Sequence, residues 1–352
     1  MTHIGLSRAG IGLSRVDLAR ALGVGLIFGA ATAAALVVST QPAEAAYVFQ
    51  NIINPGDPTF NQELGINSSG EIAGYFGSGN AGFPNKGYTT TTPYTSFTNE
   101  NFPGSTQTQV TGINDVGTTL GFYSNTNMGV GKDANFGFVD QGGSFTTVNN
   151  PATGMTLPTN QLLGVNNSNT AVGFYVDAAG LTHGYTYNIA TRVFSANIDD
   201  PNGVGATTAT AINNSGEIAG FYTNSSNVIE GFVDNGGTFT TIAPPGAQST
   251  MLLGINDNGF AVGTYTDSAG VMQGLLYDLA DNTFQNINDP FGIGTTTING
   301  INDQSQLVGF YVNGADDTIG LIANPVPEPS SLLLLAGGLL GMAVIVRRRR
   351  TG

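Results

Sequence analysis

Few side chains in the long central part of this sequence could do chemistry. His183 is the only histidine between residues 46 and 325, and the chain contains no cysteine. Neither a metal cluster of the usual imidazole and thiolate ligands nor a Cys-His catalytic pair can therefore be assembled from this region. His183 stands directly before Gly184, a place that suits strand capping or contact with solvent better than work as a base. We predict no catalytic, cofactor-binding or metal-binding residue.

Carboxylates are the remaining candidates, because two of them can hydrolyse a glycosidic bond. Glu71 and Glu217 occupy the same turn position of two sequence repeats, which favours a structural role over an acid/base pair. The acidic pairs that could supply oxygen ligands to calcium are Asp199 with Asp200 and Asp316 with Asp317. No segment has the full spacing of an EF-hand loop or of the nonapeptide calcium repeat, so no cofactor is predicted and calcium stays an open alternative.

Residues 46–325 are strongly acidic. They contain 21 Asp and Glu residues against Lys86, Lys132 and Arg192, which gives a net charge of −18. Nucleic acids and acidic polysaccharides would be repelled unless divalent cations bridge them, so we predict no nucleic-acid partner. We interpret the acidity as a means of keeping the protein soluble, with a cation-linked role as the alternative. The lone Arg192 is expected to form a salt bridge with Asp199, and contact with a sugar acid is the alternative.

Six copies of one phrase must position these side chains: "GINSSGEIAGYF", "GINDVGTTLGFY", "GVNNSNTAVGFY", "AINNSGEIAGFY", "GINDNGFAVGTY" and "GINDQSQLVGFY". The asparagines that they share, which we interpret as structural turn residues, are Asn67, Asn114, Asn166, Asn213, Asn256 and Asn302. A glycine follows each asparagine by seven residues and an aromatic residue by nine. Asn, Asp, Ser and Gly fill the next places, which predicts a tight turn between two short strands.

Two further strands complete each repeat. A Gly followed by an aromatic residue or leucine opens the third, and a segment of the form "FTTI" that ends at a proline makes the fourth. The fourth segments begin at Phe97, Phe145, Phe194, Phe239 and Phe284. The sixth repeat has none, but Tyr47 to Pro55, "YVFQNIINP", keeps the same Phe-to-Pro separation of six. We predict an all-β fold, a six-bladed β-propeller of four-stranded repeats closed by the N-terminal strand, with an open β-solenoid or an irregular stack of sheets as the alternative.

The repeats also indicate where a ligand would bind. The tyrosines at the ninth place are expected in the core, with each hydroxyl reaching water or a neighbouring strand, and a carbohydrate-stacking surface is the alternative. A small molecule or glycan is expected in the central channel or in the loops around it. The two most individual insertions are "GSGNAGFPNKG" at 77–87 and "NTNMGVGKDANFG" at 125–137.

The C-terminal stretch changes composition abruptly. It consists of the triplet Pro327, Glu328 and Pro329, a 15-residue apolar run that ends at residue 346, and the cluster Arg347, Arg348, Arg349 and Arg350. The triplet cannot continue a strand. As a helix the apolar run is roughly 22 Å long, short of a hydrocarbon core of roughly 30 Å, but flanking serines and snorkelling arginines can extend it. We predict a transmembrane helix over 330–346 with its basic tail in the cytoplasm.

This order of Pro-Glu-Pro, short hydrophobic helix and arginine cluster resembles the PEP-CTERM sorting signal. The resemblance implies a Gram-negative bacterium, an exosortase-type membrane protease as partner, and export linked to exopolysaccharide and biofilm. It also implies an intermediate anchored in the inner membrane by the C-terminal helix, followed by a final place at the cell surface or outside the cell. An ordinary C-terminal tail anchor is the alternative.

The N-terminus agrees with export. Arg8, Arg15 and Arg20 precede an apolar stretch over 21–38, and "PAEAAY" offers a signal-peptidase site after Ala45. We predict a signal peptide with its helix at 1–45, the repeat domain at 46–325 and the sorting signal at 326–352. A retained N-terminal anchor is the alternative.

The repeats themselves resemble the HAF-repeat family of extracellular bacterial proteins. The position of the histidine in that family's tripeptide is occupied by Lys86, Phe136, His183, Glu230, Gln273 and Ile319. Only the third repeat keeps the histidine, and the resemblance implies surface location more than any activity. We predict an exported, non-catalytic scaffold or interaction module of the cell surface or matrix. A glycan-processing propeller and a glycan- or calcium-binding module are the alternatives.

Overall fold

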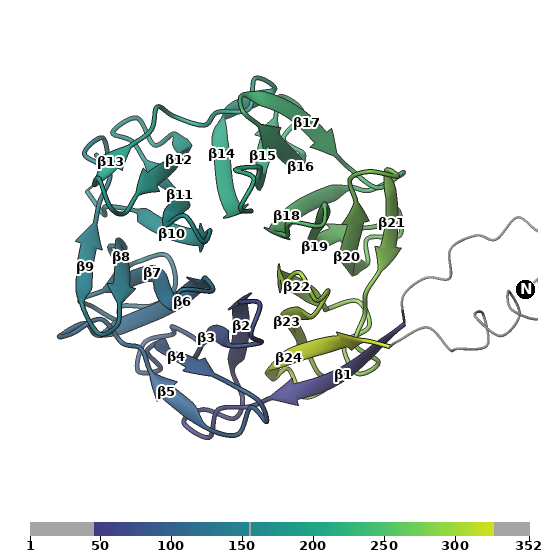
Figure 1. Cartoon of the computed structure of the whole chain (residues 1–352), viewed down its shortest axis with the longest axis horizontal. Helices are drawn as coiled ribbons and strands as arrows, with labels where there is room; N and C mark the ends of the chain where they lie inside the picture. The colour runs from purple at the N-terminus through teal and green to yellow at the C-terminus, as the bar shows by residue number, and fades with distance from the viewer. Residues whose placement is uncertain (1–45, 155, 327–352) are drawn as a thin grey trace, which may run out of the picture. The chain divides into compact units, whose positions relative to one another are not determined.

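The structure is a computed structural model that describes residues 46–326 apart from residue 155. Every regular element in this part of the chain is a β-strand, and the strands lie in antiparallel groups around a common centre (Figure 1). The predicted signal peptide, sorting triplet, transmembrane helix and arginine cluster lie outside the described residues. Within the described residues, no helix is long and apolar enough to cross a membrane. The predictions of an all-β fold and a propeller-like arrangement are confirmed.

Four of the sheets have four strands each. The first two consist of β2 (Asn61–Ile66), β3 (Ile72–Phe76), β4 (Lys86–Thr90) and β5 (Phe97–Asn99), and of β6 (Gln107–Ile113), β7 (Thr118–Ser124), β8 (Phe136–Gln141) and β9 (Phe145–Val148). The other two consist of β18 (Ser249–Ile255), β19 (Phe260–Thr266), β20 (Met272–Asp278) and β21 (Thr283–Asn286), and of β22 (Thr297–Ile301), β23 (Leu307–Val312), β24 (Thr318–Pro325) and β1 (Tyr47–Ile52).

The third and fourth repeats share one eight-stranded sheet, so the prediction of six separate blades is wrong. This sheet contains β10 (Asn160–Val165), β11 (Thr170–Val176), β12 (Thr182–Asn188), β13 (Val193–Phe194), β14 (Gly203–Ile212), β15 (Ile218–Asn224), β16 (Ile229–Asn235) and β17 (Thr238–Ile242). The cause is the length of β14, which has ten residues where the first strand of every other repeat has five to seven. Its early start allows a parallel pair between Thr182 and Ala206 to join it to β12.

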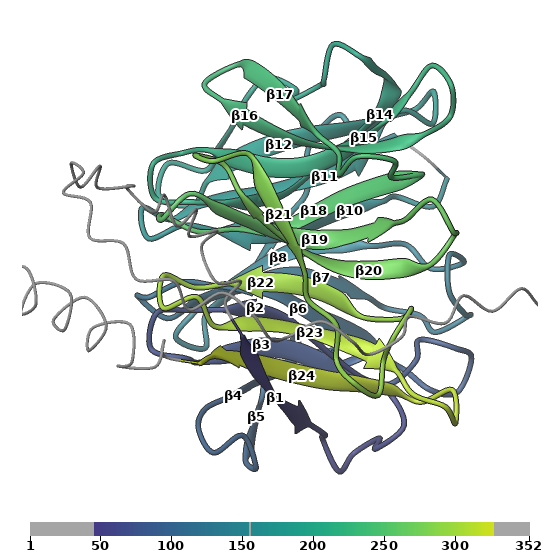
Figure 2. The ribbon, with the colours of Figure 1, turned by 90° about the vertical axis from the view of Figure 1, so that its right-hand side faces the viewer.

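The N-terminal strand closes the fold, as predicted. β1 pairs antiparallel with β24 from Tyr47 opposite Pro325 to Ile52 opposite Gly320. Figures 1 and 2 show the two strands side by side, at opposite ends of the colour scale. Beyond the pair, the Val326 amide donates to the Ala46 carbonyl oxygen at 2.8 Å. The N-terminal strand therefore completes the sheet of the last repeat, which protects the edge that an open array would expose.

The repeated aromatic and glycine positions have packing reasons. Five tyrosines at the ninth place are buried, and their hydroxyls contact the fourth strand or the residues after it, which confirms their prediction as core. The pairs are Tyr123 with Thr147, Tyr175 with Asn197, Tyr222 with Thr241, Tyr265 with Asn286, and Tyr311 with Asn51. At the seventh place, a Cβ on Gly121 would lie 1.9 Å from the Gln109 carbonyl oxygen, beside a register shift in the strand pair. Only glycine permits this close approach.

Candidate functional site

The six repeated asparagines form a closed ring of hydrogen bonds at the centre of the fold. Each side-chain Nδ2 donates to the carbonyl oxygen of the corresponding asparagine in the next repeat. The bonds run from Asn67 to Asn114 (3.2 Å), Asn114 to Asn166 (2.9 Å), Asn166 to Asn213 (3.2 Å), Asn213 to Asn256 (3.2 Å), Asn256 to Asn302 (3.0 Å) and Asn302 back to Asn67 (3.0 Å). The last bond links the sixth repeat to the first, so the ring closes without a gap.

Each of these asparagines also shapes its own turn. The Oδ1 of Asn67 accepts the amides of Ser69 at 3.1 Å and Glu71 at 2.9 Å. The same pair of bonds recurs at Asn114, Asn166, Asn256 and Asn302, and Asn213 keeps the second bond, from the Glu217 amide. This is the geometry that makes asparagine a favoured turn residue. Because donor and acceptor are both engaged, the asparagines hold the repeats together and have no free group for a ligand.

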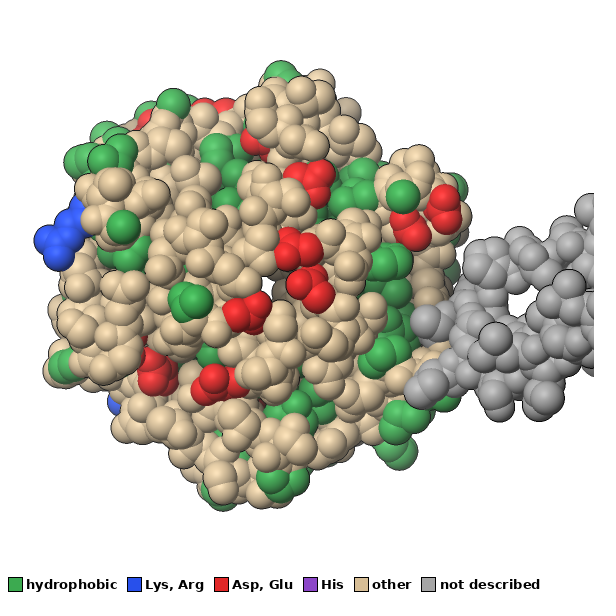
Figure 3. Space-filling model, in the orientation of Figure 1, with side chains coloured by type: hydrophobic (Ala, Val, Ile, Leu, Met, Phe, Trp, Pro, Cys, Tyr) green, Lys and Arg blue, Asp and Glu red, His purple; other side chains and the backbone are tan. Residues whose placement is uncertain are grey.

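The opening inside this ring is small and acidic. It encloses about 80 Å³, and Asp115, Asp257 and Asp303 lie along it one residue after their asparagines. Figure 3 shows acidic side chains around this central opening. Burial acts to raise the pKa of Asp115, but hydrogen bonds from Ser68 and Asn167 lower it below its usual value. Among the described residues, no three His, Asp or Glu side chains gather in a group that could hold a metal. This volume lies below the range of about 300–1,000 Å³ that is usual for small-ligand sites.

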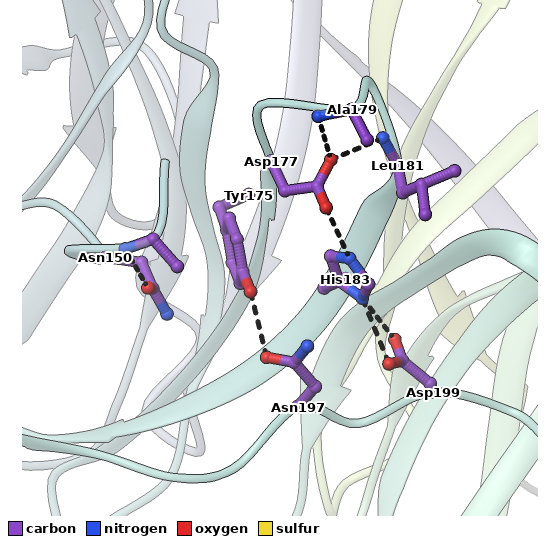
Figure 4. Close-up of polar contacts among 9 residues, drawn as sticks. Asn150, Tyr175, Asp177, Ala179, Leu181, His183, Asn197 and Asp199 are labelled. Atoms are coloured by element: carbon purple, nitrogen blue, oxygen red, sulfur yellow. Dashed lines mark hydrogen bonds and ion pairs between the residues drawn. The ribbon is translucent and has the colours of Figure 1, made fainter. Parts of the chain in front are cut away.

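His183 lies between two carboxylates on the third repeat (Figure 4). Its Nδ1 is 2.9 Å from Asp199 Oδ1, and its Nε2 is 3.4 Å from Asp177 Oδ2. Asp177 is held by its turn, because its Oδ1 accepts the amides of Leu181 and Ala179, and these bonds lower its pKa. With a carboxylate at each ring nitrogen, the imidazole ties the turn to the segment after β13. It offers no free nitrogen to a substrate.

This arrangement corrects one expectation. The salt bridge predicted between Arg192 and Asp199 is wrong, because Asp199 contacts His183 instead. Arg192 stands in the turn after β12 with a φ of 58°. The sequence does place Asp177, the second carboxylate that contacts His183, nearby: it is the first residue of the turn "DAAG", and His183 follows that turn by three residues.

Substitution of His183 by glutamine is expected to change the free energy of unfolding by less than about 1 kcal/mol, because its carboxylate partners are partly solvent-exposed. Denaturant titration of the purified protein measures this change. A loss of several kcal/mol would show that the histidine is a core element and not a surface tie.

The other acidic candidates are spread over the fold. Asp200 is buried, with Oδ1 accepting the Asn202 amide, whereas its neighbour Asp199 faces His183. Asp317 accepts a bond from Asn313 within its own turn, which also contains Asp316. Glu217 accepts bonds from Asn213 and Asn235 of its own repeat. Glu71 follows the Asn67 turn, and its amide donates to Asn67 Oδ1. The carboxylates of Asp199, Asp200, Asp317 and Glu217 thus have local partners, whereas the contacts of Asp316 and Glu71 are made by their backbone amides.

The two long insertions meet at one cavity of about 580 Å³, within the range of about 300–1,000 Å³ that is usual for small-ligand sites. Ser78 and Gly79 come from the first insertion, and Val130 and Asp133 from the second. Four aromatic residues from the first two repeats also line it, namely Phe60, Tyr75, Phe122 and Tyr123. Sequence reasoning singled out both insertions. It could not show that they share a cavity, because that depends on how neighbouring repeats are placed.

One of the similar known structures, with a TM-score above 0.5, supports the class of fold. The chain is similar to a putative TolB from Agrobacterium tumefaciens with a TM-score of 0.51, at 13% identity over 76% of this chain and 91% of that one. TolB from Acinetobacter baumannii matches with a TM-score of 0.47, at 8% identity over 77% of this chain and 66% of that one. A lectin from Aleuria aurantia matches with a TM-score of 0.44, at 12% identity over 77% and 97%. These likenesses concern the fold alone. No curated protein matches the chain.

The motif at the C-terminus gives a more particular assignment. Residues 325–350 match the model of the PEP-CTERM protein-sorting motif, which confirms the resemblance stated above. The motif marks an exported surface protein that is sorted by an exosortase, with a membrane-associated processing step.

Proposed function

We propose that the protein is a non-catalytic scaffold or interaction module of the cell surface or extracellular matrix, associated with exopolysaccharide. The observation that carries this proposal is the place of the sorting motif. The motif match begins at Pro325, the last residue of β24 and the partner of Tyr47 in the strand pair that closes the fold. In the sequence, the sorting signal thus begins where the last strand of the closed ring ends.

A closed ring suits a binding role, because it holds loops that differ between repeats on a fixed frame. The repeated side chains are used within this frame: the asparagines bridge repeats, and the tyrosines bind to neighbouring strands. What differs between the repeats is the pair of insertions and the cavity that they share. The membrane is a partner before processing, and the exosortase is the partner that acts on the triplet.

Replacing Pro327, Glu328 and Pro329 together by alanine is expected to leave the protein in the membrane fraction, whereas the wild type reaches the surface or matrix fraction. The exosortase would no longer recognise its triplet, while the apolar run stays intact. Fractionation of cells that express the full-length chain, followed by immunoblotting, measures the distribution. Equal distribution of the two proteins would contradict sorting through this motif. Release of the wild-type protein from the matrix fraction by digestion of the exopolysaccharide tests the association itself.

The competing function is glycan cleavage, although Asp177 and Asp199 occupy both ring nitrogens of His183. Incubation of the full-length protein with exopolysaccharide from the producing cells, followed by an assay for new reducing ends, separates the two functions. If the wild-type protein produces new reducing ends and the His183→Gln variant does not, the protein is an enzyme and not a binding module.

A further inference from the structure

We propose that the cavity between the two long insertions binds an uncharged oligosaccharide. This inference rests on the proposed function, since it names the ligand class through which the protein would associate with exopolysaccharide.

The first observation is a pair of amide bridges between neighbouring repeats. Gln109 Nε2 donates to Asn85 Oδ1 at 2.9 Å, and Gln161 Nε2 donates to Asn135 Oδ1 at 2.6 Å. All four residues line the cavity. Within the described chain, neither Gln109 Oε1 nor Gln161 Oε1 has a hydrogen-bond partner. The bridges fix both glutamine side chains and leave two carbonyl oxygens as acceptors for hydroxyl groups.

The second observation is that these amides break the repeat pattern. Both glutamines stand five residues before their repeat asparagine, and Gln62 has the same place in the first repeat. In the last three repeats this place is held by Thr208, Met251 and Thr297. Asn85 and Asn135 also match each other in position, and the later repeats have Thr182, Ile229, Met272 and Thr318 there. The amides are therefore not needed for the repeat fold. They occur only in the first three repeats, and the first two of these have the long insertions.

Aromatic rings give the cavity a second feature of sugar sites. Phe60 and Phe122 are half-buried cavity residues, so part of each ring is available for stacking against the C–H faces of a pyranose. The buried Tyr75 packs against Phe60 with ring centroids 6.1 Å apart and donates to Gln62 Oε1 at 2.7 Å. Gln62, the third glutamine of this series, thus holds the ring of Tyr75 in place against Phe60 at the cavity wall. The aromatic rings can contact the apolar faces of a sugar, while the fixed amides beside them can hydrogen-bond to the hydroxyl groups at its edge.

The charge of the lining selects the kind of sugar. Asp133 is the one charged residue among the described residues that line the cavity. Its carboxylate is engaged, because it accepts bonds from Thr126 and Met128 of the second insertion and from Gln107 on β6. No lysine or arginine of the described lining could compensate a uronate, sulfate or phosphate group. With a net charge of −18 over residues 46–325, an anionic ligand would be repelled.

The experiment measures binding of neutral and anionic oligosaccharides to the full-length protein by titration calorimetry. The protein is purified in a detergent without a sugar headgroup, so that the detergent cannot compete. The neutral probes are cellohexaose, xylohexaose and mannohexaose, and the anionic probe is hexagalacturonate. We expect binding of at least one neutral probe and none of hexagalacturonate.

The variants use residues that other repeats carry at the same place, so they are compatible with the fold. Gln109→Met and Gln161→Thr are each expected to weaken binding at least about tenfold, because a fixed acceptor is lost. Met251→Gln, the reverse change away from the cavity, is the matched control and should leave affinity unchanged. Val130→Arg acts on a side chain that is 74% exposed and should block the cavity without touching the core.

Absence of neutral-probe binding, preference for hexagalacturonate, or unchanged affinity in both glutamine variants and in Val130→Arg would each overturn the inference. These outcomes are separable from failure of the proposed function. If the wild-type protein is found in the matrix fraction and is released by exopolysaccharide digestion, the proposed function stands, even when this cavity binds no sugar. If the wild-type protein is absent from the matrix fraction, the proposed function is contradicted, whatever the cavity binds.

Discussion

The free energy of unfolding of the wild-type protein is expected to fall by about 5 kcal/mol as the pH rises from 4.5 to above 8, and the Glu63→Gln variant is expected not to show this fall. Glu63 lies on β2 and is completely buried. Its Oε1 accepts a hydrogen bond from the Tyr88 hydroxyl at 2.5 Å, and its Oε2 has no partner in the described structure. The corresponding position holds Val110, Leu162, Ala209, Leu252 and Ile298 in the other repeats. One repeat thus has a carboxyl group where five have an apolar core residue.

The direction of this effect follows from proton binding. Burial raises the pKa of Glu63 from 4.5 to about 8, although the hydrogen bond from Tyr88 acts to lower it. Between these values the folded protein holds a proton that the unfolded chain has released. The stability due to this group is therefore fully present below pH 4.5 and is lost as the pH rises through about 8. At pH 7 the loss is already about 3 kcal/mol.

Denaturant unfolding of the wild type and the Glu63→Gln variant at pH 5, 7 and 9 tests this expectation. The difference between the two proteins is the informative quantity, because burial also raises the pKa of Glu100 to about 7, and this group adds its own pH dependence to both. Glu63→Leu should behave like the glutamine variant at high pH. Asp281→Asn, on an exposed turn, removes one carboxylate without a burial effect and is the control. A constant difference between wild type and Glu63→Gln at all three pH values would refute the burial of an uncharged carboxyl group here.

The architecture was predictable wherever local chemistry repeats. Turn residues after Asn67 and its equivalents, and prolines after Phe97 and its equivalents, mark the ends of short strands. The match between the segment at Phe49 and the missing sixth "FTTI" predicted the closure that β1 makes with β24. The shared sheet of the third and fourth repeats was not predictable in this way. It depends on how early β14 begins relative to β12, and no turn residue encodes that contact.

The candidate site was less predictable than the fold, for a related reason. The repeat alignment alone already shows Glu63 as the exception at its position and Gln109 as one of three glutamines confined to the first three repeats, so both signals were present in the sequence. The contacts that these two side chains make in the fold were not evident from the sequence. The bridge from Gln109 to Asn85 spans two repeats. The carboxyl group of Glu63 lies between Gly74 of its own repeat, beside the unpaired Oε2, and Gly320 of the sixth repeat, beside Oε1. Contacts between repeats arise from the ring geometry, which a pattern within one repeat does not contain.

The asparagine ring gives the second large effect. Asn166→Ala is expected to lower the free energy of unfolding by about 4 kcal/mol, because three hydrogen bonds are lost and buried polar groups are left unpaired. Asn166 donates to the Asn213 carbonyl at 3.2 Å and accepts the amides of Ser168 and Thr170 at 3.1 and 3.0 Å. Asn166→Asp keeps the two acceptor bonds. It should still destabilise, since its carboxylate would face the Asn213 carbonyl in place of a donor.

The next residue provides a matched control. Asn167 also links neighbouring repeats, through bonds to Asp115 at 2.7 and 2.9 Å, but these bonds are exposed to solvent. Asn167→Ala should therefore cost less than about 1 kcal/mol, because water replaces what is lost. Denaturant unfolding of Asn166→Ala and Asn167→Ala gives the comparison, and equal losses would mean that the ring adds no more than any surface contact. A much larger loss at Asn166 would show that the repeats are held at the centre as well as by β1 at the rim. Attachment of the repeats at both places is what allows a closed ring to hold the loops of the first three repeats in fixed positions.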